Sequence, residues 1–224
     1  METLEGKVYD LMDWAAIEGI VYSEENNPHS ILGPKVVEDG ILIQTFQPQA
    51  SKVWVKNTRT GKETEMFLED ESGYYATLIS GKRIPKYVFV VENEAGERKE
   101  IGDPYAFEST IDAMDENRFL NGIHYDLYQK LGAHVREING VKGTSFAVWA
   151  PNALRVSVVG SFNEWDGRVH QMRKLHESGI YELFIPGVEV GDLYKFEIKL
   201  HGDITFLKAD PYAHACELRP DNAN

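Results

Sequence analysis

The chain has 224 residues, enough for one large domain or two of ordinary size, and 42% hydrophobic with 26% charged residues predicts a folded globular protein. With 36 acidic against 23 basic residues the net charge is -13, which disfavours nucleic acid and anionic membranes as partners because both repel a negative surface. The single cysteine, Cys216, excludes an internal disulfide, and with no signal peptide and no apolar run of about 20 residues we expect a cytoplasmic protein.

The first element expected in chain order is an N-terminal helix. Val8, Leu11, Met12 and Ala15 follow the i, i+3, i+4, i+7 spacing that lines one face of a helix, and Gly19 is expected to end it. Such a stripe can bind a partner molecule or dock on the adjacent domain of the same chain. We interpret it as a docked helix, which is the commoner case.

From Ile31 onward the pattern changes to short runs of Val, Ile, Phe and Tyr separated by Gly, Pro and Asn, which indicates strands and turns. Asp39-Gly40 and Asn139-Gly140 each lie between two such runs and predict hairpins with type I′ turns. Residues 194–201 alternate apolar and polar side chains, which is typical of an antiparallel strand with one face buried.

An internal repeat organises these strands into two copies of about one hundred residues each. The matching motifs keep their order along the chain, so small loop insertions explain why their spacing drifts. The pairs are 31–33 with 130–132, 46–50 with 149–153, 53–55 with 156–158, 73–75 with 179–181, 85–89 with 192–196, and 103–106 with 210–213.

The repeat predicts an all-β fold of two tandem immunoglobulin-like β-sandwiches, with an N-terminal helix and a short helical linker. In the linker, Ser109 and Thr110 are candidate N-caps and Gly122 is a candidate stop. The expected division is an N-terminal helix over 1–22, a first sandwich over 23–107, a linker over 108–128, a second sandwich over 129–216 and a tail over 217–224.

Motifs for catalysis, cofactors or metals are not found in the sequence. The seven histidines show no metal-ligand spacing, and there is no glycine-rich phosphate loop and no nucleophile elbow. We therefore expect no catalytic residue, no cofactor and no metal. The repeated Asp-Pro-Tyr at 103–105 and 210–212 is interpreted as structural: proline ends a strand, aspartate caps the turn, and tyrosine folds back on the sandwich.

One loop of the second copy differs from its counterpart. Residues 161–167 contain Trp165 with Asn163 beside it, whereas residues 58–64 of the first copy contain no aromatic side chain. An indole on a polar turn can stack on the apolar face of a pyranose while its neighbours bond the hydroxyls. Lys195, on the polar face of its strand, is a further candidate contact.

Each of these residues also has a structural interpretation. Trp165 can be a buried anchor of its loop, and Lys195 can be an ordinary solvated lysine. Trp149 alternates with core-facing strand positions, so we expect it to be structural.

Ordered motifs in both copies carry a resemblance to a known family. They are residues 27–34 and 103–107 in the first copy, and 127–134, 146–153, 156–167, 194–198, 208–213 and 217–220 in the second. In these residues the chain resembles the N-terminal half of bacterial 1,4-α-glucan (glycogen) branching enzymes. The second copy is similar to their family-48 carbohydrate-binding module, and the resemblance covers nearly the whole chain.

The resemblance implies a cytosolic enzyme of glycogen synthesis that cuts an α-1,4 linkage and re-forms it as α-1,6. In the family, a catalytic aspartate, a glutamate and a second aspartate lie in a (β/α)₈ barrel of about 250 residues, which this sequence does not contain. No position here inherits those roles, so the chain alone should be inactive. The partners implied are α-glucan and the catalytic barrel.

The family-48 pattern also implies site residues. Trp165 and Lys195 carry over as glucan contacts, by similarity to the glycogen-binding module of AMP-activated kinase β subunits. A second tryptophan of that module has no match, because this sequence has Gly202 to Thr205 there. Weak binding is therefore expected.

Two other functions remain open. The chain can be a protein-interaction module whose sugar affinity is vestigial, or the front module of a related debranching or trehalose-forming enzyme. The motif Leu131 to His134, directly after the predicted linker, favours a branching enzyme over the second of these.

Overall fold

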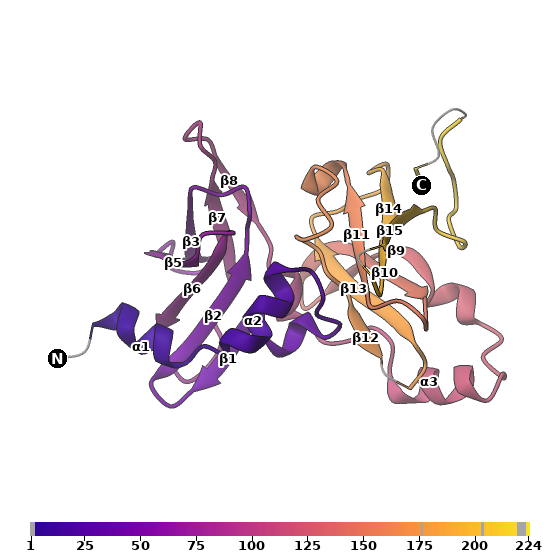
Figure 1. The fold of residues 1–224 in the computed structure, drawn as a ribbon, viewed down its shortest axis with the longest axis horizontal. Coiled ribbons are helices and arrows are strands. Elements are labelled where there is room, and N and C mark those ends of the chain that lie inside the picture. Colours follow the sequence, from indigo (N-terminus) through magenta and orange to yellow (C-terminus); the bar gives the residue numbers. More distant parts are fainter. Residues whose placement is uncertain (1–2, 176, 203, 219–222) are drawn as a thin grey trace. The chain divides into compact units, whose positions relative to one another are not determined.

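The computed structural model describes residues 3–175, 177–202, 204–218 and 223–224. In this part of the chain the predicted all-β class is confirmed, since its strands form four antiparallel sheets (Figure 1). The chain divides into two compact units, unit 1 with Met1–Tyr22 and His29–Ala106, and unit 2 with Ser23–Pro28 and Phe107–Asn224. No helix in the described ranges is long and apolar enough to cross a bilayer.

Unit 1 begins with two helices instead of the one predicted. α1 (Leu4–Asp10) and α2 (Trp14–Val21) are separated because the Asp13 side chain accepts a hydrogen bond from the Ala16 amide at 3.2 Å and starts a new helix. Gly19 does not end α2, which continues to Val21. The docked interpretation is supported, because α1 packs against a strand of unit 1 and Val8 is fully buried.

The two sheets of unit 1 enclose one apolar core. One sheet has the order β1-β2-β6-β5 and the other β4-β3-β7-β8. Ile41 and Ile43 from the first sheet meet Val53, Val55 and Phe89 from the second, as expected for a sandwich. The bounds are β1 Gly33–Val37, β2 Gly40–Phe46, β3 Lys52–Asn57, β4 Glu63–Glu65, β5 Phe67–Asp70, β6 Tyr74–Ile79, β7 Tyr87–Glu92 and β8 Arg98–Ile101, with short 3₁₀ turns η1 Pro28–Ser30 and η2 Pro104–Ala106.

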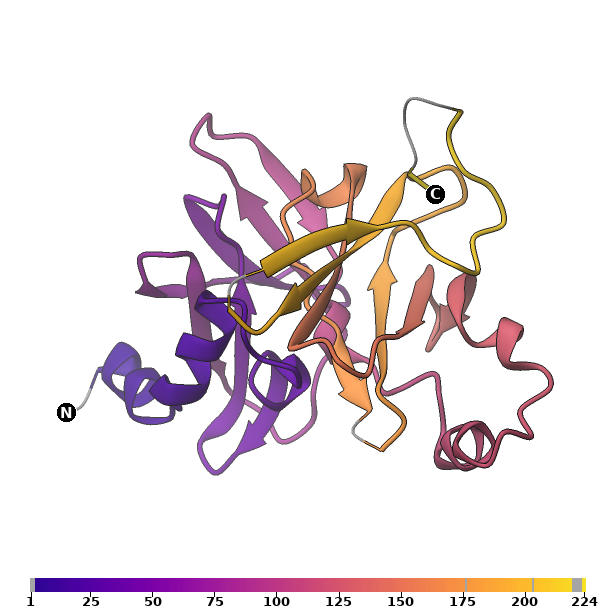
Figure 2. The same ribbon diagram turned by 45° about the vertical axis from the view of Figure 1, so that its right-hand side comes forward.

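Unit 2 repeats this arrangement. One sheet has the order β9-β10-β13-β12 and the other β11-β14-β15 (Figure 2). Phe146 of the first sheet contacts Tyr194 of the second, with ring centroids 4.9 Å apart. The bounds are α3 Ala113–Leu120, η3 Leu127–Gln129, β9 Gly132–Ile138, β10 Val141–Trp149, β11 Arg155–Gly160, η4 Ser161–Asn163, β12 Arg173–Leu175, β13 Ile180–Pro186, β14 Tyr194–Leu200 and β15 Ile204–Lys208.

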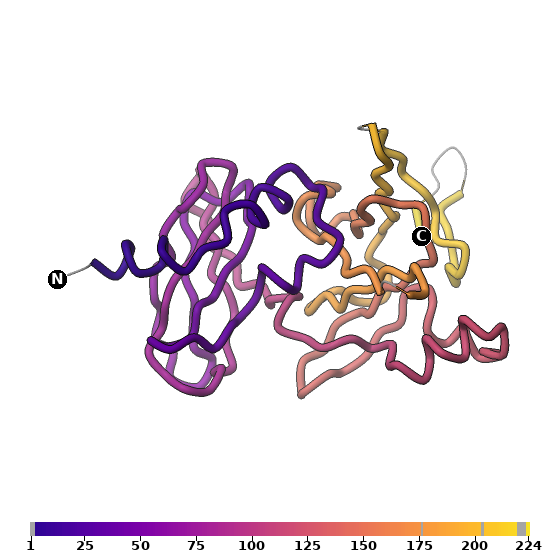
Figure 3. The backbone as a smooth tube through the Cα atoms, turned by 60° about the horizontal axis from the view of Figure 1, so that its bottom comes forward, coloured from indigo at the N-terminus to yellow at the C-terminus, as the bar shows by residue number. Residues whose placement is uncertain are grey.

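The segment predicted as a linker packs within unit 2. Ile111 is buried with Leu131, Ala147 and Ile180, so this segment covers the face of the β9-β10-β13-β12 sheet that points away from the other sheet; Figure 3 traces its path before β9. The predicted helix is present as α3, but Asp112 caps it instead of Ser109 or Thr110. Gly122 follows the helix with a φ of 68°, as a C-terminal stop requires.

The two hairpin predictions have different outcomes. Asn139 and Gly140 have φ angles of 54° and 80°, and Ile138 pairs with Val141, so this type I′ turn is confirmed. In unit 1, Val37 pairs with Gly40, so the turn is centred one residue earlier than predicted, on Glu38 and Asp39. The hairpin exists there, but its type I′ assignment is wrong because neither Glu38 nor Asp39 has a positive φ.

The predicted domain limits are not decided by these units. The helices of residues 1–22 belong to unit 1, and Ser23–Pro28, predicted as the start of the first sandwich, belongs to unit 2. There the Lys174 amide donates to the Asn26 carbonyl at 2.7 Å, and Lys199 pairs with Glu24 at 3.4 Å. The predicted tail over 217–224 lies partly outside the described residues.

Candidate functional site

The Trp165 loop, defined as residues 161–170, follows β11 in unit 2. It begins with η4 and returns at Gln171, which forms a β-bridge with Ser157 of β11. At the equivalent place in unit 1, β3 and β4 are joined only by a short turn over residues 58–62. The loop is therefore an insertion on a scaffold that both units share.

Asn163 braces the inside of this loop. Its Oδ1 accepts from the Gly160 amide at 2.8 Å, and its Nδ2 donates to the Val158 carbonyl at 2.9 Å and lies 2.8 Å from His170 Nδ1. Asn163 is only 7% exposed. Its amide thus ties both ends of the loop to β11, and its predicted contact with a sugar hydroxyl remains a prediction.

A second set of bonds holds the outer half of the loop. Arg168 forms a two-bond ion pair with Asp166, with distances of 3.0 and 2.7 Å. Burial alone would raise the pKa of Asp166, but the hydrogen bonds from Arg168 outweigh it and lower that pKa below its ordinary value. Asp166 therefore stays charged, and so keeps the pair, over the whole physiological pH range.

The loop also presses on the neighbouring strand β14. A Cβ atom added to Gly167 would lie 1.9 Å from Oε1 of Glu197, so a larger residue would have to displace this carboxylate. Glu197 is fixed in turn by the buried Arg155 of β11, with an Nη1 to Oε1 distance of 2.8 Å. This charged contact was not predicted from the sequence, although the alternation along β14 places Glu197 on the same face as Lys195.

Trp165 lies at the tip of the braced loop. Its amide donates to the Gly160 carbonyl at 3.0 Å, and Glu164 and Trp165 have φ angles of 54° and 61°. Two adjacent non-glycine residues in the left-handed region are uncommon and persist where surrounding contacts fix them. Trp165 is 39% exposed, so it is not the buried anchor that the sequence left open.

Lys195 lies at the base of the loop. It pairs with Val159 across β11 and β14, one residue before Gly160, and it is partly exposed. The strand predicted over residues 194–201 is confirmed, with Tyr194 and Phe196 buried on the inner face. The structure thus brings Trp165, Asn163 and Lys195 to one end of one sheet, and whether they contact a sugar stays a prediction.

His170 closes the loop as a neutral side chain. Its Nδ1 faces the Asn163 amide, which donates to it, and burial lowers the pKa of His170 to about 4. Its ring also packs on Phe162 with centroids 5.6 Å apart. An uncharged imidazole therefore accepts the Asn163 bond at neutral pH.

Trp149, which was expected to be structural, contacts Phe119 of α3 and is 55% exposed. Phe146 and Val148 of β10 face the other sheet, whereas Ala147 and Trp149 lie on the opposite face, beside α3. No group of three or more His, Cys, Asp or Glu in the described ranges is placed to hold a metal ion.

Comparison with known families divides the chain in the same order as its two sandwiches. Residues 13–105 match the model of the N-terminal domain of the alpha-1,4-glucan branching enzyme GlgB, and residues 130–213 match carbohydrate-binding module 48 (isoamylase N-terminal domain). The 1,4-alpha-glucan branching enzyme GlgB of Paramagnetospirillum magneticum is 43% identical over 208 residues, which are 92% of this chain and 28% of that enzyme. The chain thus spans little more than a quarter of the length of this relative.

Distant likenesses are found among solved structures. A pullulanase from Anoxybacillus sp. LM18-11, solved with maltotetraose, is 17% identical with a TM-score of 0.35, covering 86% of this chain and 26% of that one. The pullulanase from Bacillus acidopullulyticus is also 17% identical, with a TM-score of 0.33, covering 85% of this chain and 22% of that one.

Proposed function

Because the chain corresponds to the N-terminal region of the GlgB branching enzymes, we propose that unit 2 binds α-glucan through the Trp165 loop. In this role unit 2 binds the glucan and does not cleave its glycosidic bonds. Cutting and re-forming of the glucan are assigned to the remainder of the enzyme, which in the GlgB relative is longer than this chain.

The observation that carries the proposal is the exposed indole of Trp165 on a loop braced from both sides. A pyranose ring presents an apolar face of C–H groups, which packs on a flat aromatic surface while the hydroxyls stay at its edge. The left-handed backbone at Glu164 and Trp165 and the Asn163 bonds order the loop that carries the indole before any ligand arrives. A surface that is already ordered loses little entropy on binding.

The other two candidates have different roles in this proposal. Lys195, at the base of the loop, donates from its ammonium to a sugar hydroxyl. Asn163 acts mainly by positioning, since its amide is already engaged with Gly160 and Val158, and any direct sugar contact is secondary. One stacking surface with one charged donor supports weak binding to a single chain.

The proposal extends to location and to the rest of the enzyme. We place the protein in the cytoplasm, which its single exposed cysteine and its GlgB similarity support. We also propose that the two units support a catalytic barrel. Strand β15 exposes Ile204 and Phe206 on one face and Leu207 on the other. Protein contacts cover exposed apolar side chains of this kind, which also favours the second candidate, a protein-docking module with vestigial sugar affinity.

A native gel containing glycogen tests sugar binding. The protein is expected to migrate more slowly in glycogen than without it, and Trp165→Ala should weaken the retardation about tenfold, because a stacking surface is lost. Tyr22→Ala is the matched control, since Tyr22 is an exposed aromatic residue of unit 1 and its loss should leave the retardation unchanged.

Equal mobility of the wild-type protein with and without glycogen would contradict the proposal. If the protein then bound a separately expressed branching-enzyme barrel, the protein-docking function would take its place. Thermal unfolding of each variant shows whether a loss of retardation in the gel comes from the loss of a sugar contact or from unfolding of the protein.

A further inference from the structure

The indole of Trp149 is held rigidly and yet remains open. Its Nε1 donates to the Ser178 carbonyl at 3.0 Å, and its ring meets Phe119 of α3 edge to face, with centroids 6.0 Å apart and planes at 65°. Over half of the residue is nevertheless exposed. A large aromatic surface that is fixed but uncovered marks a binding position more than a packing position.

The equivalent residue of unit 1 shows that the fold does not require this exposure. Phe46 ends β2 as Trp149 ends β10, and each is followed by the same turn, in which Gln47 and Ala150 donate to the carbonyls of Gly73 and Gly179. Phe46 is only 1% exposed. In unit 1 this sheet face is closed at Phe46, whereas in unit 2 Phe119 of α3 contacts only part of the Trp149 indole and leaves over half of the residue exposed.

Each of the other two tryptophans has a side chain packed against its ring. Arg98 lies over the ring of Trp54 at 4.1 Å, and the ring of Tyr9 lies 5.0 Å from that of Trp14. Trp149 and Trp165 are the exposed indoles of this protein, and both belong to unit 2, the part that matches a carbohydrate-binding module.

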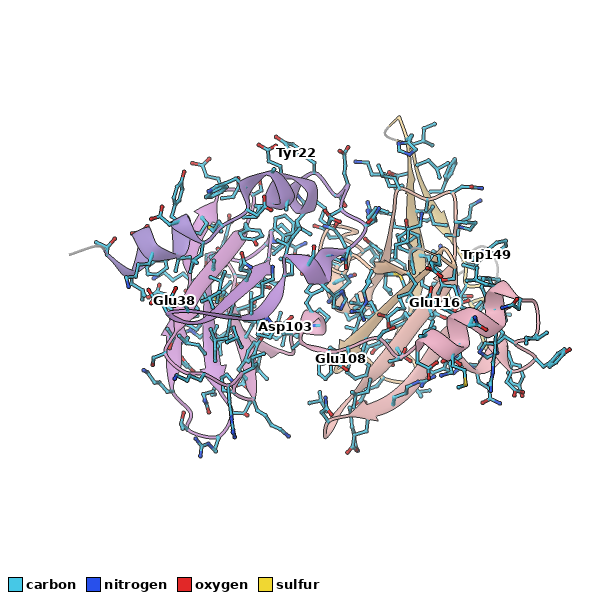
Figure 4. All side chains as sticks on the ribbon, turned by 90° about the horizontal axis from the view of Figure 1, so that it is seen from below. Tyr22, Glu38, Asp103, Glu108, Glu116 and Trp149 are labelled. Carbon is cyan, nitrogen blue, oxygen red and sulfur yellow. The ribbon has the colours of Figure 1, made fainter. Side chains whose placement is uncertain are left out.

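Polar groups are bonded to the residues next to the Trp149 indole. Glu116 of α3 accepts from the Ser178 hydroxyl at 2.8 Å, so the residue that fixes the indole also fixes a carboxylate near it (Figure 4). Lys174 is held close to the turn that follows, since its Nζ donates to the Pro151 carbonyl at 3.1 Å. A flat apolar surface with a carboxylate near it is suited to a ligand with C–H faces and hydroxyl edges.

We propose that Trp149 is a second stacking platform for α-glucan, with Glu116 as an acceptor for sugar hydroxyls. The inference rests on the proposed function of unit 2 as a glucan binder, and it adds a site to it. The two platforms lie at opposite ends of the unit, because the turn after Trp149 leads into the start of β11 and the Trp165 loop follows the end of β11. β11 spans about 20 Å at the usual rise of a strand, so each platform takes its own stretch of glucan.

Two separated platforms, each of low affinity, bind a branched polymer more tightly than a single short chain. Glycogen offers many chains at once, so engaging one platform raises the effective concentration of chains at the other. A short maltooligosaccharide occupies the platforms independently. The protein should therefore bind glycogen much more tightly than its affinity for maltoheptaose predicts.

Fluorine NMR of the whole protein labelled with 5-fluorotryptophan tests the inference with all four tryptophans in place. The four tryptophans give four resonances, each assigned by replacing one tryptophan with phenylalanine. On titration with maltoheptaose, the resonances of Trp149 and Trp165 are expected to shift and those of Trp14 and Trp54 to stay in place.

The outcomes separate the inference from the function on which it rests. A Trp165 resonance that shifts to saturation while that of Trp149 stays still overturns the second platform and leaves the proposed function intact. A shift at Trp149 alone supports the platform and removes the Trp165 loop from sugar binding. If neither resonance moves, both are overturned.

Variants give an independent measure. Trp149→Ala should reduce the number of maltoheptaose molecules bound from two to one in calorimetry and weaken glycogen affinity about tenfold or more. Tyr125→Ala, which removes a highly exposed aromatic residue of the same unit, is the matched control and should change neither value. An unchanged stoichiometry in a folded Trp149→Ala protein overturns the second platform.

Discussion

Asp103 and Asp210 hold the same turn in the two units, and both are buried. Asp103 accepts from the Tyr105 amide at 2.9 Å and from the Tyr87 hydroxyl, while Asp210 accepts from the Tyr212 amide at 2.8 Å and from the Tyr194 hydroxyl at 2.6 Å. The structural interpretation of Asp-Pro-Tyr agrees with these bonds. The tyrosine hydroxyls come from β7 and β14, and that long-range partner is invisible in the motif itself.

Burial gives Asp103 an unusual effect on stability. It raises the pKa of this carboxyl from 3.8 to about 6, despite the two hydrogen bonds, so the folded state holds the proton more tightly than the unfolded state. This contribution to the free energy of unfolding therefore increases as pH falls from about 6 to about 4. Above pH 6 the buried charge costs up to about 3 kcal/mol.

Asp103→Asn removes that charge while keeping an oxygen acceptor for the Tyr105 amide. At pH 7 the variant is expected to be as stable as the wild-type protein or more stable, and this relative advantage should shrink by about 1 kcal/mol or more at pH 5. Urea unfolding of both proteins at the two pH values measures the change. The same difference in stability at pH 7 and pH 5 would refute the argument.

The sequence predicted a sugar contact for Trp165 and a structural role for Trp149, and only the exposure of Trp165 could be expected from the sequence. Trp165 lies in a loop that one copy has and the other lacks, and this difference is visible in the sequence. Trp149 ends the apolar run Phe146 to Trp149, and in a sheet covered on both faces such a run does not say which face is sealed. The exposure of Trp149 depends on where the segment with α3 ends, which is a property of long-range packing.

Among the elements, turns were predicted best where their residues need unusual backbone angles. Asn139 and Gly140 fit the one turn type that requires two positive φ angles. At Asp39 the dipeptide was the same kind of signal, but pairing of Val37 with Gly40 moved the turn by one residue. The apolar spacing from Val8 to Ala15 likewise predicted one helix where there are two, because periodicity alone does not reveal that Asp13 caps a new helix.

Substituting two glycines of unit 1 distinguishes the cost of an unfavourable backbone angle from the cost of a steric clash. Gly73 has a φ of 103°, and an added Cβ would lie 2.5 Å from the Pro48 Cα; Gly61 has a φ of 71°, with nothing within 4 Å of such an atom. Gly61→Ala should cost about 1 kcal/mol through its backbone angle alone. Gly73→Ala should cost about 1–3 kcal/mol more, because the turn before Ala50 must shift.

Thermal unfolding of the two variants under the same conditions compares these costs. The Gly73→Ala protein should melt several degrees lower than the Gly61→Ala protein. Equal melting temperatures would mean that the turn yields freely and that the close approach of Gly73 to Pro48 does not hold the unit together.

At the scale of the whole molecule, the repeat was the strongest signal in the sequence. The sheet order β1-β2-β6-β5 of unit 1 recurs as β9-β10-β13-β12 in unit 2. Tyr75 and Tyr181 donate to the carbonyls of Ala50 and Ala153 at the same distance of 2.8 Å. Alternation, turn residues and repeat spacing all agree on this fold, which is why it was predictable. Ser23–Pro28, which belongs to unit 2, carries no such pattern.

The segment over residues 108–128 gives the sharpest test of how the chain divides. As a linker it would tolerate substitution throughout, whereas as part of unit 2 it should be sensitive at Ile111, which is 4% exposed, and tolerant at Met114, which is 62% exposed. Ile111→Ala is then expected to lower the free energy of unfolding by about 2–4 kcal/mol, through the cavity left against Leu131 and Ile180. Met114→Ala should change it by less than about 0.5 kcal/mol. Chemical unfolding of the full chain, followed by the fluorescence of the indoles of unit 2, measures both effects. Small and equal effects of the two substitutions would show that residues 108–128 form a linker.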